Sequence, residues 1–257
     1  METEVGDRVT KAVLNIAHRG ASAYCPENTM AAFKRAVELG ATAIETDVQM
    51  TSDGHAVLIH DESLQRTAGS AKLVKDVTLE ELKRLDAGSW FDPSFGGEKV
   101  PELRELLELV KPTSLLVNLE LKNGMVLYPN MEEAVVEEIR KHGMSDRIVI
   151  SSFNHYSLAK CKRLAPEIRT GILYMEGLYE PWEYAARIGA DALHAYHYAV
   201  MPEWVEQAAR RGAVYYPFTV NDPAEMRRLL SAGVSGIITD CPDKLAELLA
   251  ETEVRRG

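Results

Sequence analysis

The sequence has few cysteines and no long apolar run. Its 257 residues include three cysteines, Cys25, Cys161 and Cys241, which are far apart and in no CxxC pair. A disulfide framework and a zinc site are therefore not expected. No apolar stretch reaches the roughly 18 residues of a membrane-spanning helix. The N-terminal METEVGDRVTK is polar where a signal peptide would be basic and then apolar. We expect a cytoplasmic protein without a transmembrane segment.

Basic residues are also in the minority. The chain has 29 Lys and Arg against 39 Asp and Glu, a formal net charge of −10, and no basic run is longer than a pair. This balance argues against nucleic acid as a partner, because nucleic acids are bound largely through their phosphates. Hydrophobic residues make up 46% of the chain, enough for a sizeable core. Composition leaves the oligomeric state open.

Short apolar segments alternate with helical patterns along almost the whole chain. We predict eight major strands, at residues 13–18, 43–48, 115–121, 148–151, 170–174, 192–195, 214–220 and 236–239. We predict a helix after each strand, at residues 28–39, 102–110, 131–142, 156–164, 181–188, 202–211, 223–231 and 244–251. Eight such units in about 250 residues fit an α/β fold of the TIM type, a (β/α)8 barrel. A doubly wound sheet is the alternative, but no GxGxxG motif or P-loop follows the first strand.

One segment interrupts this rhythm. A short strand at residues 57–60 is followed by residues 61–99, which contain a helical piece at 79–85 and a loop rich in glycine and aromatic residues. Such a connection is too long for a plain loop. We therefore predict one domain over residues 1–257, with a small insertion after the second strand, at about 61–99, over the barrel mouth.

Charged side chains lie where the predicted strands end, which is where barrels of this type carry their active sites. They are His18 and Arg19 at the first strand, Glu45 and Asp47 at the second, and Glu120 and Lys122 at the third. Side chains alternate between the two faces of a strand, so Glu45 and Asp47 share one face of their strand, and Glu120 and Lys122 share one face of theirs. The apolar residues between them suit packing against the helices, so these charged residues should face the interior. Neighbouring strands are about 4.8 Å apart, so the three carboxylates should converge.

Three carboxylates in one confined site cannot all stay ionised without compensating positive charge. Lys122 and Arg19 are one source of that charge, and a divalent cation is another. An all-oxygen ligand set favours Mg²⁺ or Ca²⁺ over zinc. The alternative is an ion-pair network that only braces the barrel.

Two histidines, His18 and His60, add groups that exchange protons near neutral pH. The planar guanidinium of Arg19 suits phosphate oxygens. Carboxylates, a guanidinium, an ammonium and two imidazoles around one point indicate hydrolysis of a phosphoryl ester rather than aldol or isomerase chemistry.

Residues 16–67 read IAHRGASAYCPENTMAAFKRAVELGATAIETDVQMTSDGHAVLIHDESLQRT, and LELK and FTVNDPAEMRRLLSAGVSGIITDCPDKL occur later. The first segment resembles the N-terminal motif block of the glycerophosphodiester phosphodiesterase family, and the later ones are similar to that family's remaining landmarks. The resemblance spans nearly the whole chain. It implies a barrel with a small insertion, a divalent metal ion, and hydrolysis of glycerophosphodiesters to sn-glycerol 3-phosphate and an alcohol.

The resemblance also implies roles for individual residues. Carried over by motif, the metal ligands are Glu45, Asp47 and Glu120, the acid–base pair is His18 and His60, and the phosphate contacts are Arg19 and Lys122. We assign His18 as the base and His60 as the acid. We expect Mg²⁺ or Ca²⁺ as the cofactor, with Mn²⁺ as a further option.

Three more residues near these motifs are candidates. Glu27, in the PENT segment, is expected to bind substrate, whereas its neighbour Asn28 is equally well explained as a helix cap. Phe218 stands where the family usually has tryptophan before Thr-Val-Asn. We expect its ring to pack on the glycerol carbons of a substrate, with ordinary core packing as the alternative.

Two other functions stay open. A lysophospholipase D-like enzyme acting on lysolipids would need exposed apolar residues around the mouth, and the insertion offers only Trp90, Phe91 and Phe95. A non-catalytic barrel that binds phosphodiesters should have lost a ligand or a histidine, and none is missing.

Overall fold

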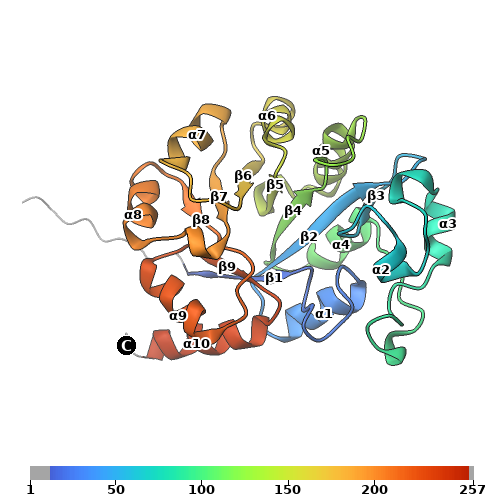
Figure 1. The fold of residues 1–257 in the computed structure, drawn as a ribbon, viewed down its shortest axis with the longest axis horizontal. Coiled ribbons are helices and arrows are strands. Elements are labelled where there is room, and N and C mark those ends of the chain that lie inside the picture. The colour runs from blue at the N-terminus through green and yellow to red at the C-terminus, as the bar shows by residue number, and fades with distance from the viewer. Residues whose placement is uncertain (1–11, 255–257) are drawn as a thin grey trace, which may run out of the picture.

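The computed structural model describes residues 12–254, in which a curved sheet is surrounded by helices (Figure 1). Eight strands are hydrogen-bonded in the order β8-β7-β6-β5-β4-β2-β1-β9, all neighbours in that order are parallel, and β3 pairs antiparallel with β2. Their bounds are β1 (Leu14–His18), β2 (Ala43–Met50), β3 (Ala56–Leu58), β4 (Leu116–Leu121), β5 (Ile148–Ser152), β6 (Arg169–Tyr174), β7 (Ala192–Ala195), β8 (Val214–Tyr215) and β9 (Gly236–Thr239).

Helices alternate with these strands and cover the outside of the sheet. They are α1 (Met30–Glu38), α2 (Gln65–Ala68), α3 (Leu79–Arg84), α4 (Leu103–Val110), α5 (Met131–His142), α6 (His155–Leu164), α7 (Pro181–Ile188), α8 (Pro202–Arg210), α9 (Pro223–Ala232) and α10 (Pro242–Val254). In Figure 1, α5 to α10 follow one another around the strands, whereas α2 and α3 lie together at one side. None of the helices within residues 12–254 is long and apolar enough to cross a membrane. The predicted (β/α)8 barrel is confirmed.

The barrel is nearly closed, and the seam lies between β8 and β9. The strand predicted at residues 214–220 ends at Tyr215, so that part of the prediction is wrong. Pro217, which has no N–H, explains the interruption, because proline cannot donate to a strand ladder. Three backbone hydrogen bonds still join the two segments: Ser235 N–H to the Tyr215 carbonyl (3.1 Å), Ile238 N–H to that of Pro217 (2.9 Å), and Val220 N–H to that of Ile238 (2.9 Å).

The first helix begins at Met30 rather than at residue 28. Thr29 is its N-cap, and the Thr29 Oγ1 accepts a hydrogen bond from the Ala32 N–H at 3.2 Å. Asn28 lies outside the helix with a φ of 56°, in the left-handed region that asparagine tolerates better than most residues. The cap interpretation of Asn28 is therefore wrong, and its side chain is free for other contacts.

Apolar side chains separate into an outer and an inner core. The outer core lies between strands and helices and includes Ile44, Val117 and Leu119, the neighbours of the charged strand residues. The inner core is smaller, with Ile16, Ala43, Ala192, Tyr216 and Ile238 at its centre. This separation is what strand alternation predicts, and it leaves the interior positions at the carboxyl ends of the strands to polar residues.

The insertion after β3 has its own small core. Its residues Leu64, Val74 and Leu82 are fully buried in one cluster, which also includes Val57 of β3. The Trp90 Nε1–H donates to the Ala87 carbonyl at 2.9 Å, which ties the aromatic loop to the segment. This part of the chain thus forms a compact layer beside the barrel.

Candidate active site

Three carboxylates meet at the carboxyl ends of adjacent strands. Glu45 and Asp47 lie on β2, Glu120 lies on β4, and Asp47 and Glu120 are register partners. One oxygen from each carboxylate lies within 4.8 Å of the others. Glu45 and Asp47 are buried, and Glu120 is largely so. The predicted convergence is confirmed, and no other trio of acidic, histidine or cysteine side chains in residues 12–254 comes this close.

Two cations lie against this cluster. The Arg19 backbone N–H donates to Glu45 Oε2 at 3.0 Å, and Arg19 Nε lies 3.3 Å from Asp47 Oδ2. Lys122 Nζ donates to Glu120 Oε1 at 3.0 Å and lies 3.8 Å from Asp47 Oδ1. Both predicted compensating residues are therefore in contact with the cluster, and together they contact all three carboxylates.

The charges still do not balance, and the pKa directions reflect this. Burial and the neighbouring Asp47 charge raise the pKa of Glu45 to about 8. Burial and the same charge also raise the pKa of Glu120, although Lys122 opposes the shift. For Asp47, burial would raise the pKa, but Arg19 and Lys122 outweigh it and the pKa is lowered.

The cluster fits a hard divalent cation. Its donors are carboxylate oxygens, which Mg²⁺ and Ca²⁺ prefer, and no sulfur or imidazole nitrogen belongs to the trio. The raised pKa of Glu45 indicates that the cluster lacks positive charge, and a bound cation would supply it. Glu45, Asp47 and Glu120 are thus able to hold a divalent cation.

His18 is oriented by a carboxylate from the far end of the chain. Asp240 comes immediately after β9, and its Oδ1 lies 2.6 Å from His18 Nδ1. Asp240 in turn accepts hydrogen bonds from Ser22 Oγ (2.9 Å) and Asn221 Nδ2 (2.5 Å). Burial lowers the pKa of His18, but the Asp240 hydrogen bond and the Glu45 charge outweigh it, so the pKa is raised. Nε2 is the ring nitrogen left for chemistry.

His60 has a similar arrangement on the other side of the cluster. His60 Nδ1 lies 2.7 Å from Asp61 Oδ1, and His60 Nε2 lies 3.2 Å from Lys122 Nζ. Lysine can only donate, so in this arrangement Nε2 accepts and the proton of a neutral ring sits on Nδ1, facing Asp61. Both histidines thus use Nδ1 to contact an aspartate and present Nε2 to the site.

Glu27 contacts two arginines. Glu27 Oε1 accepts from Arg19 Nη1 at 2.8 Å, and both of its oxygens accept from Arg66. Asn28, the neighbouring residue, donates from Nδ2 to Asp47 Oδ2 at 2.9 Å and accepts from Thr46 Oγ1 at 2.7 Å. The PENT segment therefore contacts the cluster through Asn28 and orients Arg19 through Glu27.

Phe218 lies just beyond β8, half-buried, with aromatic neighbours. Its ring centroid is 6.1 Å from that of Phe153, which follows β5, and 6.0 Å from that of Tyr196, which follows β7. The rings of Phe218 and Phe153 come from strands that are not neighbours in the sheet, so they meet across the barrel mouth. Aromatic groups therefore occupy the β5–β8 part of the mouth, and the carboxylates lie at β2 and β4.

Three residues of this site lack a role in the sequence-based prediction: Asp61, Arg66 and Asp240. Asn28 is a candidate in the sequence, but its contact with Asp47 is not predicted. A signal existed for two of them, since Asp61 directly follows His60, and Asp240 directly follows the last predicted strand. Arg66 had none, because its partners lie five and 39 positions away and meet it only through the fold.

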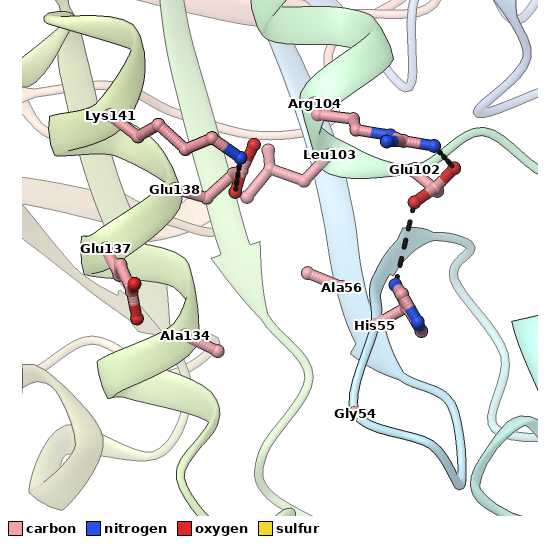
Figure 2. Close-up of a pocket in the computed structure, with 10 residues that line it drawn as sticks. All are labelled: Gly54, His55, Ala56, Glu102, Leu103, Arg104, Ala134, Glu137, Glu138 and Lys141. Atoms are coloured by element: carbon pink, nitrogen blue, oxygen red, sulfur yellow. Dashed lines mark hydrogen bonds and ion pairs between the residues drawn. The ribbon is translucent and has the colours of Figure 1, made fainter.

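A separate cavity of about 330 Å³ lies away from the cluster (Figure 2). It is lined by the β2–β3 turn, the start of α4 and one side of α5. Most of its charged groups are paired with one another: Glu102 contacts Arg104 (2.7 Å) and His55 (3.7 Å), and Glu138 contacts Lys141 (3.6 Å). None of these residues belongs to the carboxylate cluster, and the cavity has no part in the site described above.

Comparison with known proteins is consistent with this arrangement. A family model described as the glycerophosphoryl diester phosphodiesterase family matches residues 18–244. A glycerophosphodiester phosphodiesterase of Caldanaerobacter subterraneus subsp. tengcongensis is 50% identical over 244 residues, 95% of this chain and 98% of that protein. One from Bacillus altitudinis is 42% identical over 238 residues, 91% of this chain and 97% of that protein.

Solved structures give the same result. The phosphodiesterase of Oleispira antarctica in complex with the product sn-glycerol-3-phosphate superimposes with a TM-score of 0.86 at 33% identity, covering 90% of this chain and 94% of that one. A crystal structure from Silicibacter pomeroyi DSS-3 gives a TM-score of 0.85 at 29% identity, with 93% of each chain covered. With the family model matching nearly the whole chain and relatives this similar, the protein belongs to the glycerophosphoryl diester phosphodiesterase family.

Proposed function

We propose that this protein hydrolyses glycerophosphodiesters to sn-glycerol 3-phosphate and an alcohol. The observation that carries the proposal is a buried carboxylate trio with a histidine–aspartate pair on either side, next to Arg19 and Lys122. Phosphodiester hydrolysis needs these parts, since charge must be stabilised on phosphate oxygens while one proton leaves the nucleophile and another reaches the leaving group.

Glu45, Asp47 and Glu120 would hold the divalent cation, for which Mg²⁺ or Ca²⁺ is favoured by the oxygen ligands, with Mn²⁺ as a further option. A cation bound there polarises phosphoryl oxygens and stabilises negative charge on the glycerol oxygens. Arg19 and Lys122 border the same space, and their positive charges suit the remaining phosphate oxygens. The phosphate would thus lie beside the carboxylate cluster, within reach of the two basic side chains.

The histidines supply the proton transfers in this proposal. Asp240 and Asp61 fix Nδ1 of each ring, so His18 Nε2 removes a proton from the nucleophile and His60 Nε2 protonates the leaving alkoxide. Lys122 donates to His60 Nε2 in the unliganded arrangement, so the acid role requires Lys122 to turn toward the substrate phosphate. The nucleophile is either water or the glycerol 2-hydroxyl.

A lysophospholipase D-like activity is the second candidate, and one observation favours it. Exposed apolar side chains occur on the loops after three of the strands: Met125 and Leu127 follow β4, Tyr179 follows β6, and Tyr198 follows β7. Their exposed fractions are 86%, 72%, 91% and 74%. Such loops suit the acyl chain of a lysolipid better than the insertion alone does.

A product assay separates these functions. Purified protein is incubated with glycerophosphocholine, glycerophosphoethanolamine and a lysophosphatidylcholine, and the phosphorus products are identified by ³¹P NMR. We expect sn-glycerol 3-phosphate from the first two substrates, no turnover after EDTA treatment, and recovery with Mg²⁺, Ca²⁺ or Mn²⁺, because the site binds hard cations.

Turnover of the lysolipid alone would support the second candidate. No turnover of any substrate would indicate a non-catalytic barrel. Full activity in protein shown to be metal-free by elemental analysis would contradict the metal assignment.

Replacing either histidine tests the proton-transfer roles. His18→Ala and His60→Ala should each lower kcat about 10²–10⁴-fold, the usual effect of losing a general acid or base. A nitrophenyl ester, whose leaving group needs no proton, should restore rate only to His60→Ala. The matched control is His55→Ala, outside the site, which should retain wild-type rates. An equal response of both variants to the nitrophenyl ester would contradict the division of roles.

The carboxylate cluster also predicts how stability depends on pH without metal. The pKa of Glu45 is raised to about 8 from 4.5, so the metal-free wild type should lose stability as pH rises through this window. Glu45→Gln cannot ionise, yet its amide oxygen can still accept the Arg19 N–H bond. In chelator, we therefore expect the difference in unfolding free energy, variant minus wild type, to increase by about 1 kcal/mol or more between pH 5 and pH 8. This increase corresponds to a change of roughly 2–4 °C in the difference between the two melting temperatures. Thermal melts across this range measure it.

Added metal provides the companion measurement. Millimolar Mg²⁺ or Ca²⁺ should raise the melting temperature of the wild type much more than that of Glu45→Gln, because a ligand that binds only the folded state stabilises it. A variant that melts well below wild type in chelator at every pH would mean that Glu45 is needed to brace the barrel rather than to bind a cation.

A further inference from the structure

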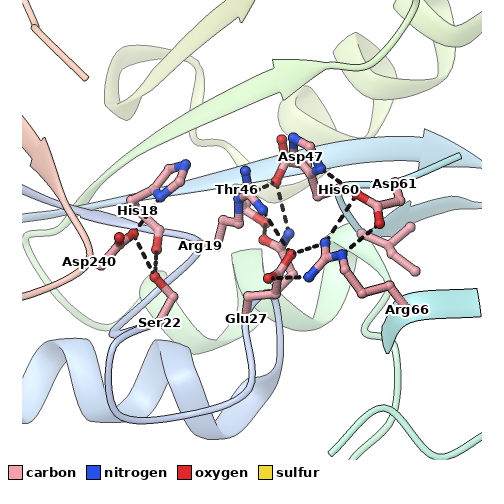
Figure 3. A network of polar contacts seen from close by, with 12 residues as sticks. His18, Arg19, Ser22, Glu27, Thr46, Asp47, His60, Asp61, Arg66 and Asp240 are labelled. Carbon is pink, nitrogen blue, oxygen red and sulfur yellow. Dashed lines mark hydrogen bonds and ion pairs between the residues drawn. The ribbon is translucent and has the colours of Figure 1, made fainter. Parts of the chain in front are cut away.

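Arg66 connects two parts of the site that are distant in sequence (Figure 3). It lies on α2, in the insertion, and its guanidinium faces two carboxylates. Toward Glu27, Arg66 Nη1 donates to Oε2 at 2.7 Å and Nη2 to Oε1 at 2.8 Å. Toward Asp61, Arg66 Nε donates to Oδ2 at 2.7 Å and Nη2 to Oδ1 at 3.1 Å. One planar group thus forms two bidentate pairs.

Each of these carboxylates contacts a residue with a proposed role in the reaction. Glu27 Oε1 also accepts from Arg19 Nη1 at 2.8 Å, and Asp61 Oδ1 lies 2.7 Å from His60 Nδ1. Through Glu27, Arg66 is therefore linked to the guanidinium of Arg19 beside Asp47. Through Asp61, it is linked to the imidazole of His60 beside Lys122. Glu27 follows β1 and Asp61 follows β3, so no single element fixes both.

The insertion in turn fixes Arg66. The Arg66 guanidinium carbon lies 5.7 Å from the centroid of the Trp90 ring, within the range of a cation–π contact. Trp90 is itself tied down by its hydrogen bond to Ala87 and by edge-to-face packing on Phe91, with ring centroids 5.8 Å apart. The aromatic loop of the insertion therefore braces the arginine.

We propose that Arg66 is a positioning residue, which aligns His60 and Arg19 with each other through Asp61 and Glu27; the proposal rests on the function proposed above. Arg66 does not contact the substrate in this account, since Nε, Nη1 and Nη2 are all engaged by carboxylates. Lysine cannot take its place, because one ammonium cannot form two planar bidentate pairs. The insertion thus contributes a supporting contact to the reaction without reaching the phosphate.

The matched control is Arg84, which lies in the same insertion and pairs with the exposed Glu80 one helical turn away. Arg66→Lys and Arg84→Lys are compared with wild type on glycerophosphocholine, with kcat and KM measured separately and melting temperatures recorded. Arg66→Lys should lower kcat/KM about 10–100-fold, as loss of an orienting partner usually does. Because His60 and Arg19 are both affected, kcat should fall and KM should rise, while Arg84→Lys stays within about twofold of wild type.

Chemical rescue distinguishes positioning from general support of the fold. Arg66→Ala opens space for a free cation at a side chain that is 42% exposed, so millimolar guanidinium chloride should restore part of its activity and add nothing to wild type. Any one of three results would overturn the proposal: Arg66→Lys keeps activity within about twofold of wild type, both lysine variants lose activity equally, or guanidinium does not restore the activity of Arg66→Ala. An inactive wild type would instead contradict the proposed function. If Arg66→Ala does not fold, the kinetics of Arg66→Lys decide.

Discussion

Three carboxylates at one buried place need positive charge, and most features of this site follow from that need. Two unit charges 4.8 Å apart, the span within which one oxygen of each carboxylate falls, repel by about 3 kcal/mol at an effective dielectric constant of 20. Arg19 and Lys122 offset two of the three charges. The remaining charge requires a proton, which the raised pKa of Glu45 indicates, or a cation. The same cluster is therefore a source of instability when empty and a cation site when filled.

Orientation is the second constraint. Three of the proposed functional groups have a carboxylate partner outside the cluster: Asp240 for His18, Asp61 for His60 and Glu27 for Arg19. These partners come from the last strand end, the start of the insertion and the loop after β1. The barrel strands fix the cluster, whereas the loops and the insertion fix the groups that act around it. This separation lets the rigid part of the fold carry the charge and the more variable part carry the alignment.

The sequence could predict what depends on local patterns. Strand alternation was enough to place Glu45, Asp47 and Glu120 on one face, and the strand–helix rhythm was enough for the barrel. Boundaries depend on single residues, and Pro217 ended β8 earlier than its apolar pattern suggested. Partners far apart in the chain were not predictable, because no pattern links His18 to Asp240, 222 positions away, or Arg66 to Glu27. The His18–Asp240 pair exists only once the sheet has curved to bring β1 beside β9.

The position of a bound cation tests most directly whether the three carboxylates form a cation site. Crystals grown with Mn²⁺ and measured at a wavelength where manganese scatters anomalously locate the ion without reference to activity. Charge compensation at the cluster predicts one strong anomalous peak among Glu45, Asp47 and Glu120, within coordination distance of an oxygen from each. It also predicts that Arg19 and Lys122 stay beside the cluster when the ion is bound. A peak elsewhere, or none at this cluster at millimolar Mn²⁺, would contradict the account and identify the carboxylates as a brace between β2 and β4.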